Sequence, residues 1–140
     1  GIGADKNLTI KGGGTVEASS EKDAAVEAKG SLAATNASLN VNGVEYGVYA
    51  HKGITLDHAN VTVRASKGRY GGANALFTYQ DDIVVKNGST VDAFAEGEVS
   101  AAFSTRLPKI MHKSVSAIPH SSGRSTVISV SIPWFCAIPA

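Results

Sequence analysis

The chain has 140 residues, a formal net charge of +1 and a single cysteine, Cys136. This length fits one domain, the charge gives no overall attraction to nucleic acid, and one cysteine excludes an intrachain disulfide. No apolar run approaches the roughly 18–20 residues of a membrane span. We therefore expect neither nucleic-acid binding nor membrane insertion.

The first repeat begins at Leu8 and shows the pattern that recurs along the chain. Residues 1–7 form a polar lead-in, interpreted as the remnant of a preceding repeat or as a cap. Leu8-Thr9-Ile10 then alternates apolar and polar residues, and so does Thr15-Val16-Glu17-Ala18 after a glycine corner at 12–14. Alternation of period two is typical of a strand with one buried face. The glycines lack the lysine and helix of a phosphate loop, so we interpret them as corner geometry.

The same paired segments recur at residues 32–41, 54–65 and 83–93. Their first apolar residues stand at positions 8, 32, 54 and 83, which gives spacings of 24, 22 and 29 residues. The corner position falls in the same place in each repeat, at Gly12, Asn36, His58 and Asn87. Glycine and asparagine tolerate the left-handed backbone region best, and histidine is somewhat enriched there. Corners in register are what stacked coils require.

A third strand is predicted in each repeat, with inward residues Val26, Val48, Leu76 and Ala102. In the same segments Ala28, Ala50, Thr78 and Ser104 are expected to point inward as well. The inner columns of the first strand are predicted to be Leu8/Leu32/Ile54/Ile83 and Ile10/Ala34/Leu56/Val85. The third repeat is longer because of an insertion at residues 67–74, which should loop outward.

Repeats of twenty-odd residues with three short strands and no helical periodicity predict a β-solenoid. The predicted fold is all-β, a right-handed parallel β-helix of about four coils with three short strands each, over residues 1–105. Residues 106–140 hold four basic side chains and no acid, and a strand is expected at 126–132. Two interpretations of 106–140 stay open: a C-terminal cap, or a tail foreign to the repeats. Exposed ladder edges at the coil ends predict self-association or a cover.

At these residues the chain resembles the right-handed parallel β-helix repeats of secreted and surface proteins of gut-type bacteria, with pectin-lyase-like architecture. Gly13-Gly14-Thr15-Val16-Glu17-Ala18 carries the resemblance most closely, and it extends over roughly residues 8–105. The resemblance implies a secreted or cell-surface location. Because that fold hosts adhesins, binding modules and polysaccharide-cleaving enzymes, it implies no single activity.

Stacking places equivalent outward residues about 4.8 Å apart, which gathers aromatic side chains on one face. One outward column is predicted to hold Glu27, Tyr49, Phe77 and Phe103, and the next Lys29, His51, Tyr79 and Thr105. Tyr49, His51, Phe77 and Tyr79 are the candidate ligand-binding residues. Such a face can stack on sugar rings, be covered by the tail or by a neighbouring chain, or be exposed without a role.

Catalytic chemistry has weaker support in the sequence. Glu17 and Asp92 share a column but stand three coils apart, about 14 Å, which is too far for the carboxylate pair of glycoside hydrolysis. His51, His58, His112, His120 and Cys136 have no metal-ligand spacing, so no metal, cofactor or catalytic residue is assigned. The predicted function is a non-catalytic surface or adhesion module that binds a polysaccharide or a protein surface weakly. The alternative is a fragment of a polysaccharide lyase or glycoside hydrolase.

Overall fold

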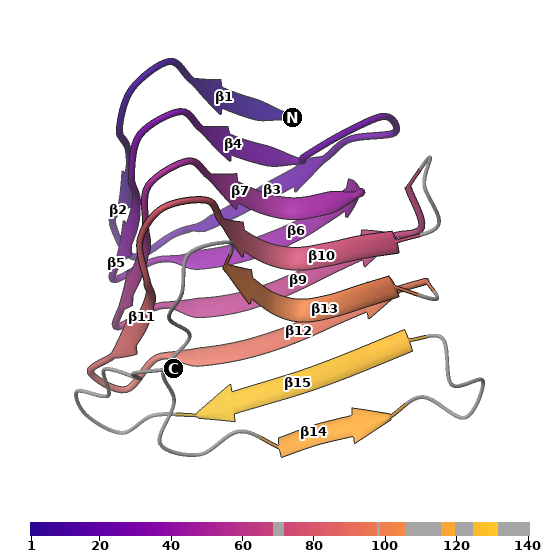
Figure 1. Ribbon diagram of the computed structural model, residues 1–140. Helices are drawn as coiled ribbons and strands as arrows, with labels where there is room; N and C mark the ends of the chain where they lie inside the picture. The colour runs from indigo at the N-terminus through magenta and orange to yellow at the C-terminus, as the bar shows by residue number, and fades with distance from the viewer. Residues whose placement is uncertain (69–71, 98, 106–115, 120–124, 132–140) are drawn as a thin grey trace.

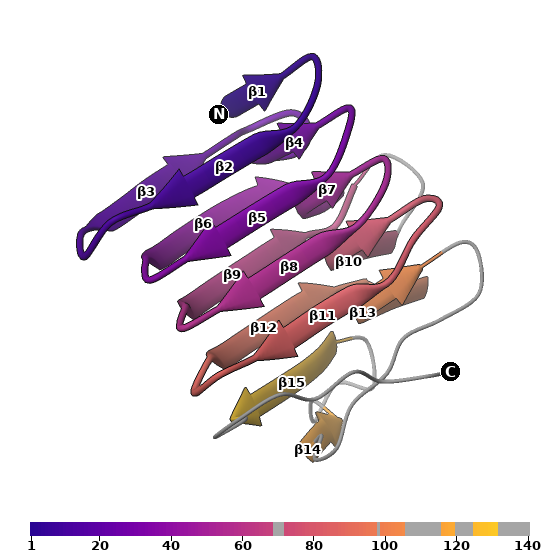
Figure 2. The ribbon, with the colours of Figure 1, turned by 90° about the vertical axis from the view of Figure 1, so that its left-hand side faces the viewer.

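The chain folds as a parallel β-solenoid of about four coils, in which three sheets enclose one core (Figures 1 and 2). The computed structural model describes residues 1–68, 72–97, 99–105, 116–119 and 125–131. Every regular element in these residues is a strand. The all-β solenoid prediction is therefore confirmed, while the right-handed sense of coiling stays a prediction.

Each coil contributes one strand to each sheet, so strands far apart in sequence lie side by side. The first sheet, here called sheet A, contains β1 (Ile2–Ala4), β4 (Val26–Ala28), β7 (Tyr46–Ala50), β10 (Gly72–Thr78) and β13 (Val99–Thr105). Sheet B contains β2 (Leu8–Lys11), β5 (Leu32–Thr35), β8 (Ile54–Asp57) and β11 (Ile83–Lys86). Sheet C contains β3 (Thr15–Ser19), β6 (Ser38–Val44), β9 (Asn60–Ser66), β12 (Thr90–Glu96), β15 (Ser125–Ser131) and β14 (Ser116–Pro119).

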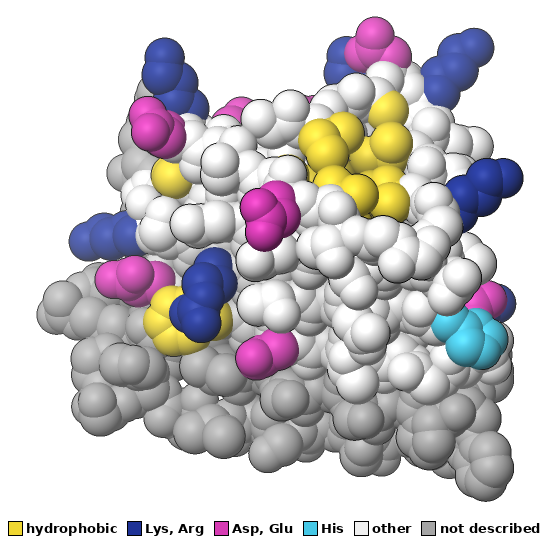
Figure 3. Space-filling model, turned by 180° about the vertical axis from the view of Figure 1, so that it is seen from behind, with side chains coloured by type: hydrophobic (Ala, Val, Ile, Leu, Met, Phe, Trp, Pro, Cys, Tyr) yellow, Lys and Arg dark blue, Asp and Glu magenta, His cyan; other side chains and the backbone are white. Residues whose placement is uncertain are grey.

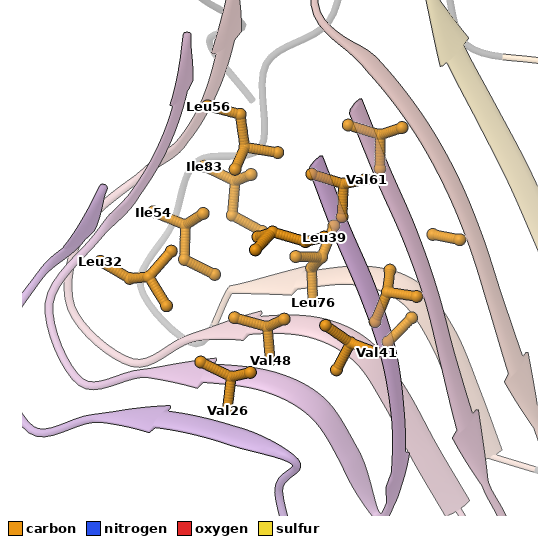
Figure 4. Close-up of a cluster of buried hydrophobic side chains, with 14 of the residues drawn as sticks. Val26, Leu32, Leu39, Val41, Val48, Ile54, Leu56, Val61, Leu76 and Ile83 are labelled. Atoms are coloured by element: carbon orange, nitrogen blue, oxygen red, sulfur yellow. The ribbon is translucent and has the colours of Figure 1, made fainter. Parts of the chain in front are cut away.

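The inner columns of sheet B match the predicted register. Leu32 pairs with Leu8 and Ile54, and Ile54 pairs in turn with Ile83. The alternating apolar residues of all three sheets meet in one core (Figure 4), where Leu32, Ile54, Leu56, Leu76 and Ile83 are the largest fully buried side chains. Burial of this kind is the main favourable term for folding, about 1.5–3 kcal/mol for each such side chain.

The predicted corners are confirmed in every coil. Gly12, Asn36, His58 and Asn87 all have positive φ, at 113°, 49°, 49° and 54°. This left-handed backbone turns the chain from sheet B into sheet C within two or three residues. Residues that tolerate this backbone conformation therefore recur at the equivalent corner of each coil.

The predicted register of the fourth coil in sheet A is wrong by one residue. Phe103, not Ala102, stands opposite Leu76, and Phe103 is 7% exposed. Ser104 pairs with Phe77, and Thr105 pairs with Thr78. This register buries an aromatic ring, which removes far more apolar surface from water than burying an alanine does. Phe103 therefore does not belong to the outward column assigned to it, and Thr105 stands opposite Thr78 in the ladder and not beside Tyr79 as predicted.

Two smaller predictions also change. The insertion at 67–74 is shorter than expected, because Gly72, Ala73 and Asn74 already belong to β10. The lead-in at 1–7 contains β1, which pairs in parallel with β4, and this favours the interpretation as part of a preceding coil. The predicted strand at 126–132 is observed as β15.

The two ends of the stack differ. At one end β15 pairs with β12 in the antiparallel direction, in contrast to the parallel pairing of the coils, and β14 pairs with β15. At the other end β1, β2 and β3 are the outermost described strands of their sheets. Ile2, Leu8, Ile10 and Val16 are only partly buried there, and Figure 3 shows a hydrophobic patch at this end. Self-association through this end stays a prediction.

Candidate functional site

Aromatic rings gather on the outer side of sheet A, on neighbouring strands β7 and β10 and the residues that follow them. This aromatic face consists of Tyr46, Tyr49, His51, Phe77 and Tyr79, all half-buried. Tyr49 and Phe77 stack with ring centroids 5.5 Å apart and planes at 16°, and His51 and Tyr79 stack at 5.0 Å and 9°. Tyr46 contacts both Tyr49 and Phe77, at 5.3 and 5.2 Å. The face is one contact cluster of three rings beside a stacked pair.

A bend in β7 brings Tyr46 and Tyr49 to the same side of the sheet. Gly47 and Val48 are both buried, so the strict alternation of the strand breaks between them. A Cβ on Gly47 would collide with the Val63 side chain and lie 2.7 Å from the Ala75 carbonyl oxygen. Only glycine fits at that point, and the two consecutive inward residues allow two outward tyrosines three positions apart, without a change of register against β10.

A hollow of about 210 Å³ lies beside these two tyrosines, lined by Asp23, Ala24, Glu27, Tyr46 and Tyr49. Glu27 on β4 stands directly opposite Tyr49 in the ladder. Asp23 lies in the β3–β4 connection, which is held to the next coil by two hydrogen bonds, from Val44 N–H to the Asp23 carbonyl and from Ala25 N–H to the Gly47 carbonyl. The Asp23 carboxylate also accepts the Ala24 N–H at 2.8 Å. The lining of the hollow is thus fixed by backbone pairing.

The electrostatics of the hollow are negative. Burial raises the pKa of Tyr49, and the neighbouring Glu27 carboxylate raises it further. Burial likewise raises the pKa of Tyr46, with Glu45 and Asp23 adding to the effect. Nearby negative charge disfavours ionisation of a phenol, so both tyrosines remain neutral hydrogen-bonding groups at ordinary pH.

All four predicted ligand-binding residues, Tyr49, His51, Phe77 and Tyr79, lie on this face. The structure brings them together as two stacked pairs. Sequence reasoning placed Glu27 in the outward column of Tyr49 without assigning it to the site, and it did not assign Tyr46 or Asp23 because both lie outside the regular alternation. The signal that could have found Tyr46 is the glycine that follows it within a strand, which often marks a bulge.

A second polar cluster lies at the corner between β8 and β9. Asp57 Oδ1 accepts hydrogen bonds from Asn87 Nδ2 at 2.9 Å and from His58 Nδ1 at 2.7 Å, and Lys86 Nζ is 3.9 Å from Asp57 Oδ2. The Asn87 hydrogen bond is the main cause that holds the pKa of Asp57 below its ordinary value, although partial burial opposes it. These contacts connect the corners of two successive coils, which is a structural role.

The acidic column of sheet C offers no close carboxylate pair. Glu17, Asn40, Thr62 and Asp92 occupy one register position on β3, β6, β9 and β12. The two acids are therefore three strand spacings apart, about 14 Å. Within the described residues, no group of three or more His, Cys, Asp or Glu side chains could hold a metal ion, and no helix is long and apolar enough to cross a membrane.

Comparisons with protein-family models, curated proteins and solved structures gave no match to this chain. The structure supports the β-solenoid architecture of the chain.

Proposed function

We propose that this chain is a non-catalytic module of a secreted or cell-surface protein, of the right-handed pectin-lyase-like β-helix type of gut bacteria, and that it binds carbohydrate. The observation that carries the proposal is the aromatic face, where five half-exposed rings gather on one side of one sheet. Exposed aromatic clusters mark contact surfaces more often than scattered apolar residues do. Sugar rings present apolar C–H faces that stack on such side chains.

The stacking within the face decides which rings a sugar can reach. Tyr49 and Phe77 lie nearly parallel, as do His51 and Tyr79, so each pair covers part of its own ring faces. The side of Tyr49 that faces Glu27 borders the hollow instead. Carboxylate oxygens of Glu27 and Asp23 can accept hydrogen bonds from sugar hydroxyls there. We therefore place the principal contact at Tyr46 and Tyr49, with Phe77 as support.

Binding through two or three rings should be weak. Each ring contributes about 1 kcal/mol, so two or three rings together supply about 2–3 kcal/mol, which corresponds to dissociation constants of roughly 5–35 mM. Useful attachment then depends on many copies along a surface.

The test is affinity electrophoresis in gels that contain soluble polysaccharides, combined with a glycan array. Wild type should be retarded by at least one polymer, and the double variant Tyr49→Ala/Phe77→Ala should not. Phe94→Ala is a matched control, because Phe94 is a half-buried ring on sheet C that packs under Arg64 at 5.5 Å. If no polymer retards wild type and only the double variant loses stability, the aromatic face is packing surface and the proposal is wrong.

The alternative is a fragment of a polysaccharide lyase or glycoside hydrolase, and one observation favours it: Asp23 and Glu27 line the same hollow. Two carboxylates across a sugar are the requirement for glycoside hydrolysis. Assays for reducing ends and for unsaturated products on pectin, alginate and neutral glycans decide between the two. If wild type forms a product that neither Asp23→Asn nor Glu27→Gln forms, the protein is an enzyme and the proposal of a non-catalytic binding module is wrong.

A further inference from the structure

The hollow beside Tyr46 and Tyr49 has the chemistry of a site for an organic cation. Its volume, about 210 Å³, is smaller than the roughly 300–1,000 Å³ of pockets that enclose a whole drug-sized ligand. It suits one headgroup or one substituent of a larger molecule. The rest of that molecule would extend across the aromatic face.

Two walls of the hollow are tyrosine rings set steeply against each other. Their planes meet at 68° and their centroids are 5.3 Å apart. The face of an aromatic ring carries partial negative charge, so a cation is attracted to it. Rings that meet at a steep angle can contact one cation from two sides, which is how aromatic cages hold substituted ammonium groups.

The remaining lining adds formal negative charge. Glu27 is half-buried opposite Tyr49, and Asp23 is exposed at the rim. The basic side chain nearest along β4, Lys29, has its ammonium group 2.6 Å from Asp5 Oδ1. Lys29 pairs mainly with Asp5, and the Glu27 carboxylate raises the pKa of Lys29 only as a smaller contribution, so Asp23 and Glu27 keep the hollow negative. The raised pKa values of both tyrosines agree with this negative environment.

We propose that this hollow binds an alkylammonium group, either the amine of a glucosamine unit or a trimethylammonium headgroup. The proposal rests on the carbohydrate-binding function above and narrows it from polysaccharides in general to amine-bearing ones. Polymers of uronic acids, such as pectin and alginate, carry carboxylates and are repelled by Asp23 and Glu27. N-acetylation removes the ammonium charge and with it the attraction.

The experiment is titration of the ¹⁵N-labelled full chain followed by amide chemical shifts. The probes are choline, the glucosamine tetramer, its fully N-acetylated counterpart and an oligogalacturonate. The glucosamine tetramer is expected to bind at least about tenfold more tightly than its N-acetylated form, with shifts centred on β4, β7 and the β3–β4 connection. Choline separates the two sources, because it tests the ammonium group without a sugar.

Variants identify the groups responsible. Glu27→Gln keeps the size of the side chain and should weaken binding of the amine probes about fivefold or more, as loss of one close charge implies. Tyr49→Phe keeps the ring and should leave binding nearly unchanged. Glu17→Gln, which changes an exposed acid on sheet C, is the matched control and should have no effect. Added salt should weaken the amine probes more than any neutral one.

The outcomes separate this inference from the proposed function. Equal or tighter binding of the N-acetylated tetramer, or unchanged amine binding in Glu27→Gln, overturns the cation site while carbohydrate binding stands. If choline binds and no oligosaccharide does, the cation site is supported and the proposal of carbohydrate binding is wrong. If no probe shifts any resonance of the hollow at millimolar concentration, the cation site is wrong.

Discussion

Two buried hydroxyl groups allow a prediction in which similar substitutions have opposite effects. Thr78 and Ser89 are the buried polar residues of the described chain, and both are 0% exposed. Ser89 Oγ accepts the Ala59 N–H at 3.0 Å and donates to the Lys86 carbonyl at 2.6 Å. Among the residues that the structure describes, Thr78 Oγ1 has no hydrogen-bond partner. Removing the hydroxyl should therefore stabilise the protein in one case and destabilise it in the other.

The magnitudes follow from what each hydroxyl leaves behind. Ser89→Ala leaves the buried Ala59 N–H without a hydrogen-bond acceptor, and an unsatisfied buried group costs about 1–3 kcal/mol. Thr78→Val replaces an unsatisfied hydroxyl by a methyl group of similar size and keeps the β-branched shape that strands favour. We expect Thr78→Val to stabilise the protein by about 1–2 kcal/mol, because burying a hydroxyl without a partner costs about 1–3 kcal/mol.

The assay is urea denaturation of both variants and wild type, followed by circular dichroism, with thermal midpoints as a second measure. At this chain length about 1 kcal/mol corresponds to roughly 3–4 °C. The midpoint should rise for Thr78→Val and fall for Ser89→Ala, with the denaturant slope unchanged. A fall of similar size in both would mean that the Thr78 hydroxyl is hydrogen-bonded, and the reasoning from burial would be wrong.

Three further predictions test the register and the corner cluster. Leu56→Ala should destabilise by about 2–5 kcal/mol, and Thr55→Ala by less than about 1 kcal/mol; equal denaturation midpoints would contradict the register of β8. Phe103→Ala should cost about 3–5 kcal/mol and Ser104→Ala little, whereas the reverse order would restore the alignment expected from sequence. Asp57 has a lowered pKa in the folded protein, so its contribution is complete above its ordinary value of 3.8 and is lost as the pH falls below it. The stability difference between wild type and Asp57→Asn should therefore shrink on acidification in a series of denaturation curves, and a difference that does not depend on pH would contradict the corner network.

Most of the solenoid could be predicted because its local and global requirements coincide. The corner turns through the left-handed backbone region, which favours residues such as Gly12, Asn36 and Asn87. Stacking of the coils then requires these corners to lie directly above one another. The apolar residues on either side alternate with period two because one face of each strand is buried. Each coil therefore repeats the same sequence pattern, and an ambiguous strand register in one coil can be resolved by alignment with the neighbouring coils.

The fourth coil of sheet A lacks this redundancy, and the prediction failed there. Ala102-Phe103 can be aligned in two ways with Leu76-Phe77 by alternation alone. The deciding term is the burial of the Phe103 ring opposite Leu76, which is an energetic preference and not a pattern. A comparison of buried apolar area for the two registers would have favoured the observed one.

The candidate site shows a different limit of period-two reasoning. Tyr46 and Tyr49 are an odd number of positions apart, so a regular strand would place them on opposite faces. The consecutive buried pair Gly47 and Val48 reverses the facing of the chain between them, and the second ring wall of the hollow exists only because of that reversal. Asp23 lines the same hollow from the β3–β4 connection, which has no alternating pattern of apolar and polar residues from which its position could be predicted. The same consecutive buried pair recurs in β10 at Ala75 and Leu76, so the bend is shared by neighbouring coils, whereas the period-two pattern describes neither this bend nor the β3–β4 connection.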